Sequence, residues 1–485
     1  MHIPFENSYS STLPQYFYTK MKASPVSSPE LIKVNLKLAR ELGLNLDEEK
    51  PEHLAQLFSG NQLPANAESI AQAYSGHQFG SFNPTLGDGR ALLLGDIKSP
   101  DGCTYDIQLK GSGPTNYSRG GDGRSAIGPV IREYIISEAM HRLGVPTTRA
   151  LAAVHSGDKV FRRQVTPGGV FTRVARSHVR VGTFEYFSHH HSLKDVQALA
   201  DFVIAKLYPQ TSNAENPYTA FFKNVVIGQA NLVASWDQLG FIHGVMNTDN
   251  TSISCETIDY GPCAFMDYYS PDTVFSSIDR QGRYAFNNQA RIAQWNLARL
   301  AECLLPLFDD NQDIAVSKAE ELLGAFSNTY TSSWFDGMHR KLGINDVKAQ
   351  LEAQDMSLID EFLSELQQHS LDYTGVFRAL SKSLDSQVEC TELSSQWQQK
   401  WKQCLNNQGI DLEQVASDMN SINPIYIPRN HIVEEAIAAA EASDYRPFKQ
   451  LVDILDEPYT ETEGLDRFAQ PSPKDAPKYQ TFCGT

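Results

Sequence analysis

Two short runs with the pattern of β-strands lie on either side of a turn near residue 100. Residues 91–97 are mostly apolar, and residues 105–110 alternate between apolar and polar, with Lys110 on the polar face. A period of two is typical of a strand with one buried face. The Pro-Asp-Gly at 100–102 favours a tight turn, so the two runs predict a β-hairpin.

Longer stretches carry the apolar spacing of amphipathic helices. One over about 127–143 ends before Gly144 and Pro146, residue types that commonly follow a helix. Ser192 and Asp195 have the spacing of a capping box and predict a helix start. Further helices are predicted over 31–42, 218–238 and 432–442, and further strand-like runs over 148–154 and 169–175.

The order of these elements, strands first and helices later, predicts an α+β fold. A two-strand unit over 251–254 and 257–258 is expected to interrupt the helical part, and the last thirty or so residues to form a wandering tail. A small strand-rich lobe before a larger helical lobe is also the order of a protein kinase, although many α+β proteins share it. The expected units are an N-terminal helical extension (1–80), a strand-rich nucleotide-binding N-lobe (81–185), a C-lobe with a metal-binding loop (186–310), and a helical C-terminal extension and tail (311–485).

Composition narrows the functional class. Hydrophobic residues make up 41% of the 485 residues, which is ordinary globular composition, and the formal net charge is −17. Such an acidic chain is expected to be repelled by nucleic acid. There is no secretory signal and no run of about 18 apolar residues, so no membrane span is expected. Seven cysteines without CxxC spacing indicate a reducing compartment, and we expect a cytoplasmic protein.

Two glycine-rich segments are candidates for binding phosphate. Gly87 and Gly89 lie just before the first strand of the hairpin, where backbone N–H groups can approach an anion. An isolated pair of this kind is more often a plain turn. The loop 111–124 has recurring glycines interleaved with Asp122 and arginines, and it leads toward a helix start, which favours phosphate binding over a flexible surface loop.

Lys110 and Glu133 are predicted to form an ion pair. Lys110 ends its strand, and Glu133 lies on the helical face that also carries Ile136 and Met140. A carboxylate on a partly apolar face requires a partner, and kinases use such a pair to hold nucleotide phosphates.

The segment 243–259 carries the most specific pattern. Asn250 follows His243 by seven residues, as in the kinase catalytic loop, and Asp259 begins an Asp-Tyr-Gly in the place of the kinase Asp-Phe-Gly. Oxygen ligands at Asn250 and Asp259 suit Mg²⁺ or Mn²⁺. Val245 occupies the position of the catalytic aspartate and cannot accept a proton, so Asp249 is the candidate base.

With these motifs the chain resembles the selenoprotein O family, kinase-like proteins that act as protein adenylyltransferases. The resemblance rests on Tyr74–Gly80, Leu86–Arg90, the Lys110 loop, His243–Asn250, Asn423–His431 and the C-terminal Cys483-Gly-Thr, where some relatives carry selenocysteine. It implies that ATP is bound flipped relative to kinases, with the γ-phosphate buried. It further implies that AMP is transferred to protein Ser, Thr or Tyr hydroxyls, with self-modification also possible.

The family's site residues carry over as follows. Arg173 and Arg180 would hold the outer phosphates, and Asp249 would accept the proton. Asn250 and Asp259 would hold the metal, Mg²⁺ or Mn²⁺. The remaining nucleotide contacts would be Gly87, Gly89, Arg90, Lys110, Asp122 and Gly123. Burying a triphosphate requires cations, and guanidinium groups meet that need better than lysine.

Other readings stay open beside AMP transfer: UMP transfer from UTP, phosphotransfer as in kinases, and an ATP-binding pseudokinase without activity. The triplet His189–His191 is taken as exposed and not as a metal site, and Cys263 as packed. Tail cysteines in the family can form regulatory disulfides, which makes Cys483 a redox candidate with no partner identified. The protein substrates themselves are not identified.

Overall fold

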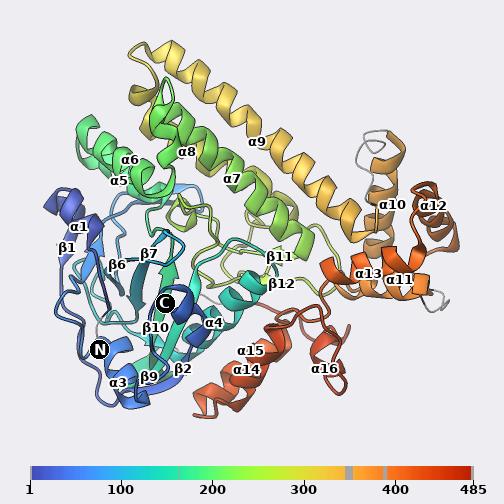
Figure 1. The fold of residues 1–485 in the computed structure, drawn as a ribbon, viewed down its shortest axis with the longest axis horizontal. Coiled ribbons are helices and arrows are strands. Elements are labelled where there is room, and N and C mark those ends of the chain that lie inside the picture. The colour runs from blue at the N-terminus through green and yellow to red at the C-terminus, as the bar shows by residue number, and fades with distance from the viewer. Residues whose placement is uncertain (1–2, 163, 345–352, 386–389, 482–485) are drawn as a thin grey trace.

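The computed structural model describes residues 3–162, 164–344, 353–385 and 390–481. It is a mixed α and β structure in which a sheet occupies one half and helices the other (Figure 1), so the predicted α+β class is confirmed. The main sheet is antiparallel, with strand order β1-β3-β6-β7-β10-β9-β2 and β8 added beside β10. Its strands are β1 (Tyr18–Lys20), β2 (Glu30–Val34), β3 (Ile70–Gln72), β6 (Ala91–Lys98), β7 (Thr104–Lys110), β8 (Ser125–Ala126), β9 (Arg149–Phe161) and β10 (Val165–Ala175).

The predicted hairpin and the helix that follows it are confirmed. Strands β6 and β7 pair with Ala91 opposite Lys110, and α4 (Ile127–Arg142) lies against β9 and β10. The strand-like runs over 148–154 and 169–175 become β9 and β10, which extend beyond both predictions and pair with one another. Two short helices, α2 (Leu36–Glu41) and α3 (Pro51–Phe58), accompany the sheet on the side of β2 and β9, and α1 (Ser8–Thr12) precedes β1.

The helical half is built around three long helices. They are α7 (Pro217–Leu239), α8 (Gln289–Phe308) and α9 (Gln312–Lys341), which pack along one another. The capping box at Ser192 is present at the start of α6 (Leu193–Leu207). A second small sheet joins β11 (Phe241–Ile242) to β12 (Ala264–Phe265) at the end of α7.

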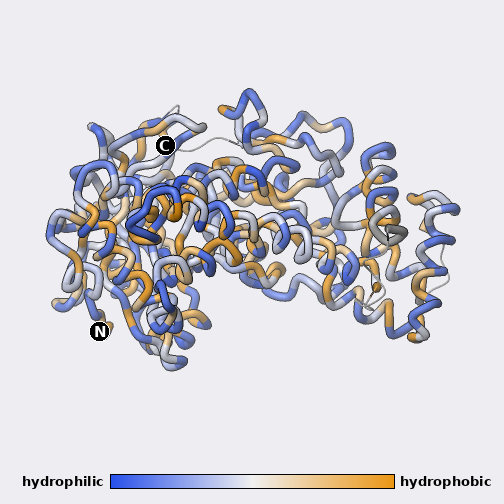
Figure 2. Tube along the Cα trace, turned by 90° about the horizontal axis from the view of Figure 1, so that it is seen from above, coloured by the Kyte–Doolittle hydropathy of each residue, from blue (hydrophilic) through white to orange (hydrophobic). Residues whose placement is uncertain are grey.

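The later helices form two groups. The first group is α10 (Ala353–His369), α11 (Gly375–Asp385), α12 (Ser395–Asn407) and α13 (Leu412–Ile422). These helices share an apolar cluster that also includes residues of β11, β12 and the end of α9. This group lies at one end of an elongated molecule, which Figure 2 shows from above. The second, α14 (Asn430–Glu441), α15 (Arg446–Leu455) and α16 (Asp466–Ala469), returns to the sheet, where α14 and α15 pack on α4.

Three predicted features are wrong. The helix over 31–42 is strand β2 followed by α2, because β2 pairs with β9 at the edge of the sheet and Asn35 then caps α2 by accepting from Leu38 N. The two-strand unit over 251–258 does not form, since Ser252 bridges to Arg180 and Thr257 to Thr147 instead of to each other.

The third wrong prediction concerns the C-terminal tail, which was expected to be a wandering segment. The described part of the tail instead packs against the body of the protein. The side chain of Thr481 donates to the Pro262 carbonyl, and its backbone N–H donates to the Phe275 carbonyl. One helix that the sequence pattern did not predict, α5 (Val181–His190), begins directly after Arg180. Each of these differences from the predicted elements results from contacts with segments distant in sequence, which local sequence patterns do not reveal.

Candidate active site

The predicted Lys110–Glu133 pair is present at the boundary between sheet and helices. Lys110 ends β7, and its Nζ donates to Glu133 Oε2 at 2.7 Å. Glu133 lies on the face of α4 that contacts β10, and it is 3% exposed. The same Nζ donates to Asp259 Oδ1 at 2.9 Å, which joins the sheet to the segment after the 243–250 loop.

Both predicted arginines also converge on Asp259. Arg173 on β10 donates through Nη2 to Asp259 Oδ1 at 2.6 Å and pairs with Glu133 as well. Arg180, the residue before α5, donates through Nη1 to Asp259 Oδ2 at 2.8 Å and to the Asp249 carbonyl at 2.8 Å. The structure therefore brings Lys110, Arg173 and Arg180 around one carboxylate, as a cluster of three cations and two carboxylates.

Electrostatics fix the charge states in this cluster. Burial opposes the charged form of Asp259, but Arg173, Lys110 and Arg180 outweigh it and hold the pKa of Asp259 well below its usual range. Burial lowers the pKa of Lys110, although Asp259 and Glu133 oppose that shift.

The backbone of Asp259 is also unusual. Its φ is +63°, a conformation that is costly for a residue other than glycine. Such strain persists where the surroundings enforce it, and it is concentrated at functional sites.

The loop 243–250 lies directly beside this cluster. His243 Nε2 donates to the Ile258 carbonyl at 2.9 Å, which ties the loop to the residue before Asp259. Asn250 donates its amide nitrogen to the Val245 carbonyl at 3.0 Å, so its amide oxygen is the atom that it can offer to a cation. Asn250 and Asp259 would offer an amide and a carboxylate oxygen as ligands, which fits Mg²⁺ because that ion takes few protein ligands alongside phosphate oxygens and water.

Asp249 has an unsatisfied carboxylate oxygen. Its Oδ1 is buried without a hydrogen-bond partner among the described residues, and its Oδ2 accepts from Gln78 Nε2 at 3.2 Å. Burial raises the pKa of Asp249 to about 6, against the opposing effect of Arg180. A desolvated carboxylate with a free lone pair is suited to accept a proton from a substrate.

A hairpin that sequence reasoning left without a role holds the loop in place. Strands β4 (Gly76–Gln78) and β5 (Ser81–Asn83) pair with one another, and η3 (Thr248–Asn250) lies against β4. The backbone N–H of His77 donates to Thr248 Oγ1 at 2.7 Å, and that of Phe79 donates to Asn247 Oδ1 at 3.1 Å. Part of this hairpin lies in Tyr74–Gly80, one of the motifs on which the family resemblance rests. That motif was the signal in the sequence that could have identified the hairpin as part of the site.

The glycines near Gly87 have a packing role. A Cβ on Gly87 would lie 2.2 Å from the Tyr117 ring, and one on Gly123 would lie 2.1 Å from the Gly113 backbone. These glycines allow the loop 111–124 to fold closely on itself and against the turn before β6. Asp88, a buried carboxylate between Gly87 and Gly89, was missed; burial raises its pKa to about 6.

Of the remaining predicted residues, some lie near the ion cluster and others lie away from it. Arg90 lies near enough to Lys110 for its charge to help lower the pKa of that lysine. Asp122 instead pairs with Arg162 at 2.9 Å near the surface. The three histidines His189–His191 are exposed, and Cys263 is buried, both as predicted. Cys483 lies outside the described residues.

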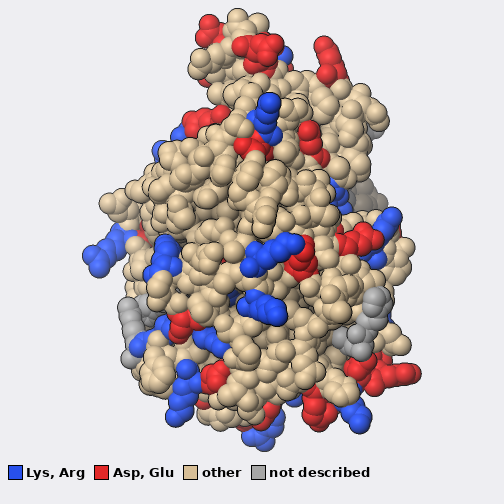
Figure 3. All heavy atoms as spheres, turned by 90° about the vertical axis from the view of Figure 1, so that its left-hand side faces the viewer, with Lys and Arg blue, Asp and Glu red and all other residues tan. Residues whose placement is uncertain are grey.

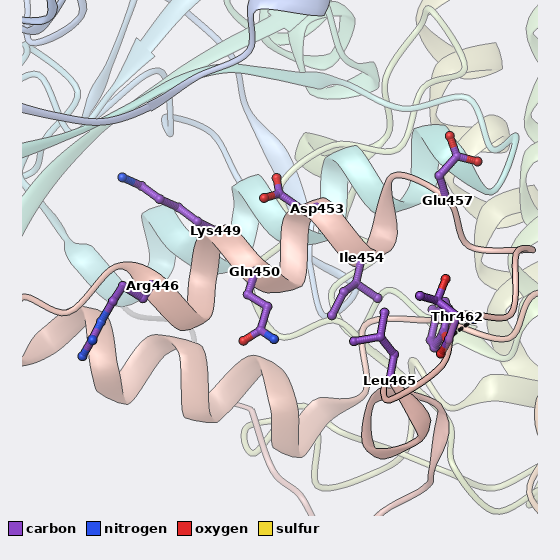
Figure 4. A pocket seen from close by; sticks show the side chains of 9 residues that line it. Arg446, Lys449, Gln450, Asp453, Ile454, Glu457, Thr462 and Leu465 are labelled. Atoms are coloured by element: carbon purple, nitrogen blue, oxygen red, sulfur yellow. Dashed lines mark hydrogen bonds between the residues drawn. The ribbon is translucent and has the colours of Figure 1, made fainter.

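The cavity beside α15 and the surface charges do not indicate another catalytic site. A cavity of about 590 Å³ beside α15 is drawn in Figure 4, where the side chains of Lys449, Gln450 and Asp453 point in different directions and do not converge. Among the described residues no three His, Cys, Asp or Glu side chains cluster as a metal site, and no helix is long and apolar enough to cross a bilayer. On the face in Figure 3, basic and acidic side chains are interspersed.

Comparison with known proteins gives a consistent result along the whole chain. A family model described as "Protein adenylyltransferase SelO" matches residues 1–456. A "Protein nucleotidyltransferase YdiU" from Rhizobium meliloti is 50% identical over 491 aligned residues and covers 99% of each chain. Proteins of the same name from Brevibacillus brevis and Anoxybacillus flavithermus are 49% and 50% identical, and each match covers 99% of this chain.

Proposed function

Because the chain belongs to the SelO family and is a protein nucleotidyltransferase, we propose that it transfers AMP from ATP to Ser, Thr or Tyr hydroxyls of proteins. The observation that carries this proposal is the convergence of Lys110, Arg173 and Arg180 on Asp259 beside the loop that presents Asp249 and Asn250. Buried cations at this density are suited to a triphosphate, because charge-assisted hydrogen bonds are strong where water is excluded.

The positions of the two arginines support a flipped orientation of ATP. Arg173 and Arg180 are 1% and 4% exposed, so they are the most deeply buried of the three cations. The β- and γ-phosphates carry most of the charge and would lie there, where phosphate oxygens replace Asp259 as partners of the guanidinium groups. This leaves the α-phosphorus toward Asp249, whose backbone carbonyl accepts from Arg180.

In the proposed reaction the acceptor hydroxyl oxygen attacks the α-phosphorus, and the bond from that phosphorus to the bridging oxygen of pyrophosphate breaks. Asp249 takes the hydroxyl proton, and Arg173 and Arg180 hold the leaving pyrophosphate. Lys110, oriented by Glu133, holds the nucleotide in place for the attack. Asn250 and Asp259 would hold Mg²⁺ or Mn²⁺, which neutralises phosphate charge. Catalysis then rests on positioning and on charge stabilisation.

We also propose the kinase-like division of the chain. Residues 81–185 would form the N-lobe and 186–310 the C-lobe, with extensions over 1–80 and 311–485. The sheet from β6 to β10 and the loop 243–259 support this division, since they supply the two sides of the ion cluster. Scattered cysteines without paired spacing fit a cytoplasmic enzyme.

UMP transfer from UTP is the second candidate. The name of these relatives specifies nucleotidyl transfer and not adenylyl transfer, so it does not distinguish ATP from UTP. The ion cluster would contact the phosphates and not the base, so its chemistry would be the same for either nucleotide.

The test uses the purified full chain with Mg²⁺ or Mn²⁺ and ATP labelled at the α- or the γ-phosphate, with α-labelled UTP in parallel. Modification of the chain itself and of a generic protein acceptor is measured by label and intact mass. We expect α-label and a mass gain of one AMP. Label from UTP in preference to ATP would establish UMP transfer, and label only from the γ-phosphate would make the protein a kinase. No transfer from any nucleotide, with ATP still bound, would leave a pseudokinase.

The role of Asp249 is tested with Asp249→Asn, which keeps the shape of the side chain. We expect transfer to fall by about 10²–10⁴-fold, the usual contribution of a general base. The dissociation constant of ATP should change little, because the carboxylate of Asp249 contacts Gln78 and none of the three cations. Loss of ATP binding in this variant would remove the support for the base role.

A further inference from the structure

A second cavity lies beside the hairpin that positions Asp249. It has a volume of about 670 Å³ and is bordered by the hairpin tip, the segment before α8, α8 itself and α9. Its lining includes Phe79, Arg283, Arg291, Trp295 and Leu323. None of the residues assigned above to ATP, the metal or the proton lines it.

The hairpin connects this cavity to the reaction site through hydrogen bonds. Phe79, at the tip, is one of the residues that line the cavity, and its N–H donates to Asn247 Oδ1 and to the Tyr284 hydroxyl, both at 3.1 Å. One residue earlier, Gln78 donates to Asp249 Oδ2. A molecule bound in the cavity would therefore lie next to the loop that carries the proposed base.

The two arginines of this cavity have no salt-bridge partner in the described parts of the chain, although the Asp279 carboxylate accepts from the Arg283 backbone N–H. Arg283 and Arg291 form no salt bridge with any described Asp or Glu, although the whole chain carries a net charge of −17. The Arg283 guanidinium lies over the Trp295 ring at 4.9 Å and against Gly80, and its Nε is buried without a hydrogen-bond partner. Stacking on an aromatic ring holds a guanidinium in place, and the N–H groups of Arg283 that do not contact the Tyr284 hydroxyl can bind an anion.

We propose that this cavity binds the acceptor protein, through a segment with an acidic side chain close to the hydroxyl that is modified. This inference rests on the proposed function and adds the class of substrate. A carboxylate of the acceptor pairs with Arg283 and Arg291, and an apolar neighbour packs on Phe79 and Trp295. Arginine and aromatic residues are the types that most often dominate the energy of protein interfaces.

The test measures nucleotidyl transfer to pairs of synthetic peptides. The two members of each pair share one central hydroxyl residue and differ by Asp or Lys at a single flanking position, which is varied along the series. We expect the Asp peptides to be preferred at one or two neighbouring positions. Arg291→Glu should raise the KM for those Asp peptides about tenfold and shift the preference to the Lys peptides. The dissociation constant of ATP should stay unchanged.

Arg340→Glu is the matched control, because Arg340 is also an exposed arginine on a helix and the change in net charge is the same. It should leave the peptide preference as in the wild type. Equal transfer to Asp and Lys peptides by both the wild type and Arg291→Glu would overturn the inference while the proposed function stands. If the wild type transfers nothing to any peptide or to itself, the proposed function fails first.

Discussion

The side chain of Asp259 holds three cations together in the protein without nucleotide, and the proposed mechanism gives it a second role as a metal ligand. It accepts from Lys110, Arg173 and Arg180 in a site that is mostly buried. Removing one partner of a buried ion pair is strongly destabilising, because the remaining charge is left uncompensated. A bound triphosphate would supply the missing negative charge and release Asp259 to hold the metal.

This argument makes a prediction for Asp259→Asn. We expect no detectable transfer, and a loss of stability in the absence of nucleotide of about 3–5 kcal/mol. Inorganic triphosphate should raise the melting temperature of the variant more than that of the wild type, since it replaces the lost charge. Differential scanning fluorimetry with and without triphosphate measures this. Full transfer activity, or an equal shift for both proteins, would contradict the assignment.

Lys341 is a buried lysine for which a pH dependence follows. It ends α9, is 5% exposed, lies over the Phe377 ring at 4.1 Å and pairs with no described carboxylate. Burial lowers its pKa to about 7. Between that value and the pKa of about 10.4 in the unfolded chain, the unfolded state binds more protons, so stability contributed by this group rises with pH across that window.

The prediction is that Lys341→Met raises the melting temperature, most strongly below pH 7, where the buried lysine is charged. It should also flatten the rise in stability from pH 7 upward. Thermal unfolding at a series of pH values measures both effects. A variant that melts below the wild type at pH 6, with the same pH dependence, would indicate that the lysine has a favourable partner. Lys400→Met is the control, since Lys400 is exposed on α12.

At the scale of secondary-structure elements, sequence patterns predicted what local periodicity determines. Strand alternation placed Lys110 on the polar face of β7, and helix periodicity placed Glu133 toward it, so this pair was predicted. The hairpin β4–β5 and helix α5 were not predicted, because each is short and is held by contacts with distant residues. Asp88 was missed for the same reason, since its buried carboxylate accepts from Gln72 N and Gln108 Nε2, which are distant in sequence.

The hairpin also gives a prediction about positioning. A Cβ on Gly76 would lie 2.6 Å from Asp249 Oδ1 and 3.0 Å from its Cβ, so Gly76→Ala should displace the proposed base. We expect kcat to fall toward the value of Asp249→Asn while ATP binding remains. Gly324→Ala is the control, because Gly324 lies within α9 and a Cβ there would meet no other part of the protein within 4 Å. Normal kcat in Gly76→Ala would show that the hairpin does not position Asp249.

At the scale of the whole molecule, one buried arginine joins segments that are far apart in sequence. Arg429 donates to Asp267 at 2.8 Å, to Asp372 at 2.7 and 2.8 Å, and to the Ala469 carbonyl at 2.8 Å. Asp267 follows β12, Asp372 precedes α11, and Arg429 begins the return of the chain through α14 to α4, which carries Glu133. Asn423–His431, one of the motifs on which the family resemblance rests, thus has a structural role that could not be assigned from the sequence.

We therefore expect Arg429→Met to destabilise the fold by about 3–5 kcal/mol, because two carboxylates lose their buried partner. Since α14 packs on α4, the loss should also weaken ATP binding at Lys110 and Glu133, although Arg429 contacts neither residue. Thermal unfolding and ATP titration of the same sample measure both. Arg446→Met, which removes an exposed pair with Asp444, is the control and should change neither value. A destabilised variant with normal ATP affinity would mean that the C-terminal helices support the fold without supporting the site.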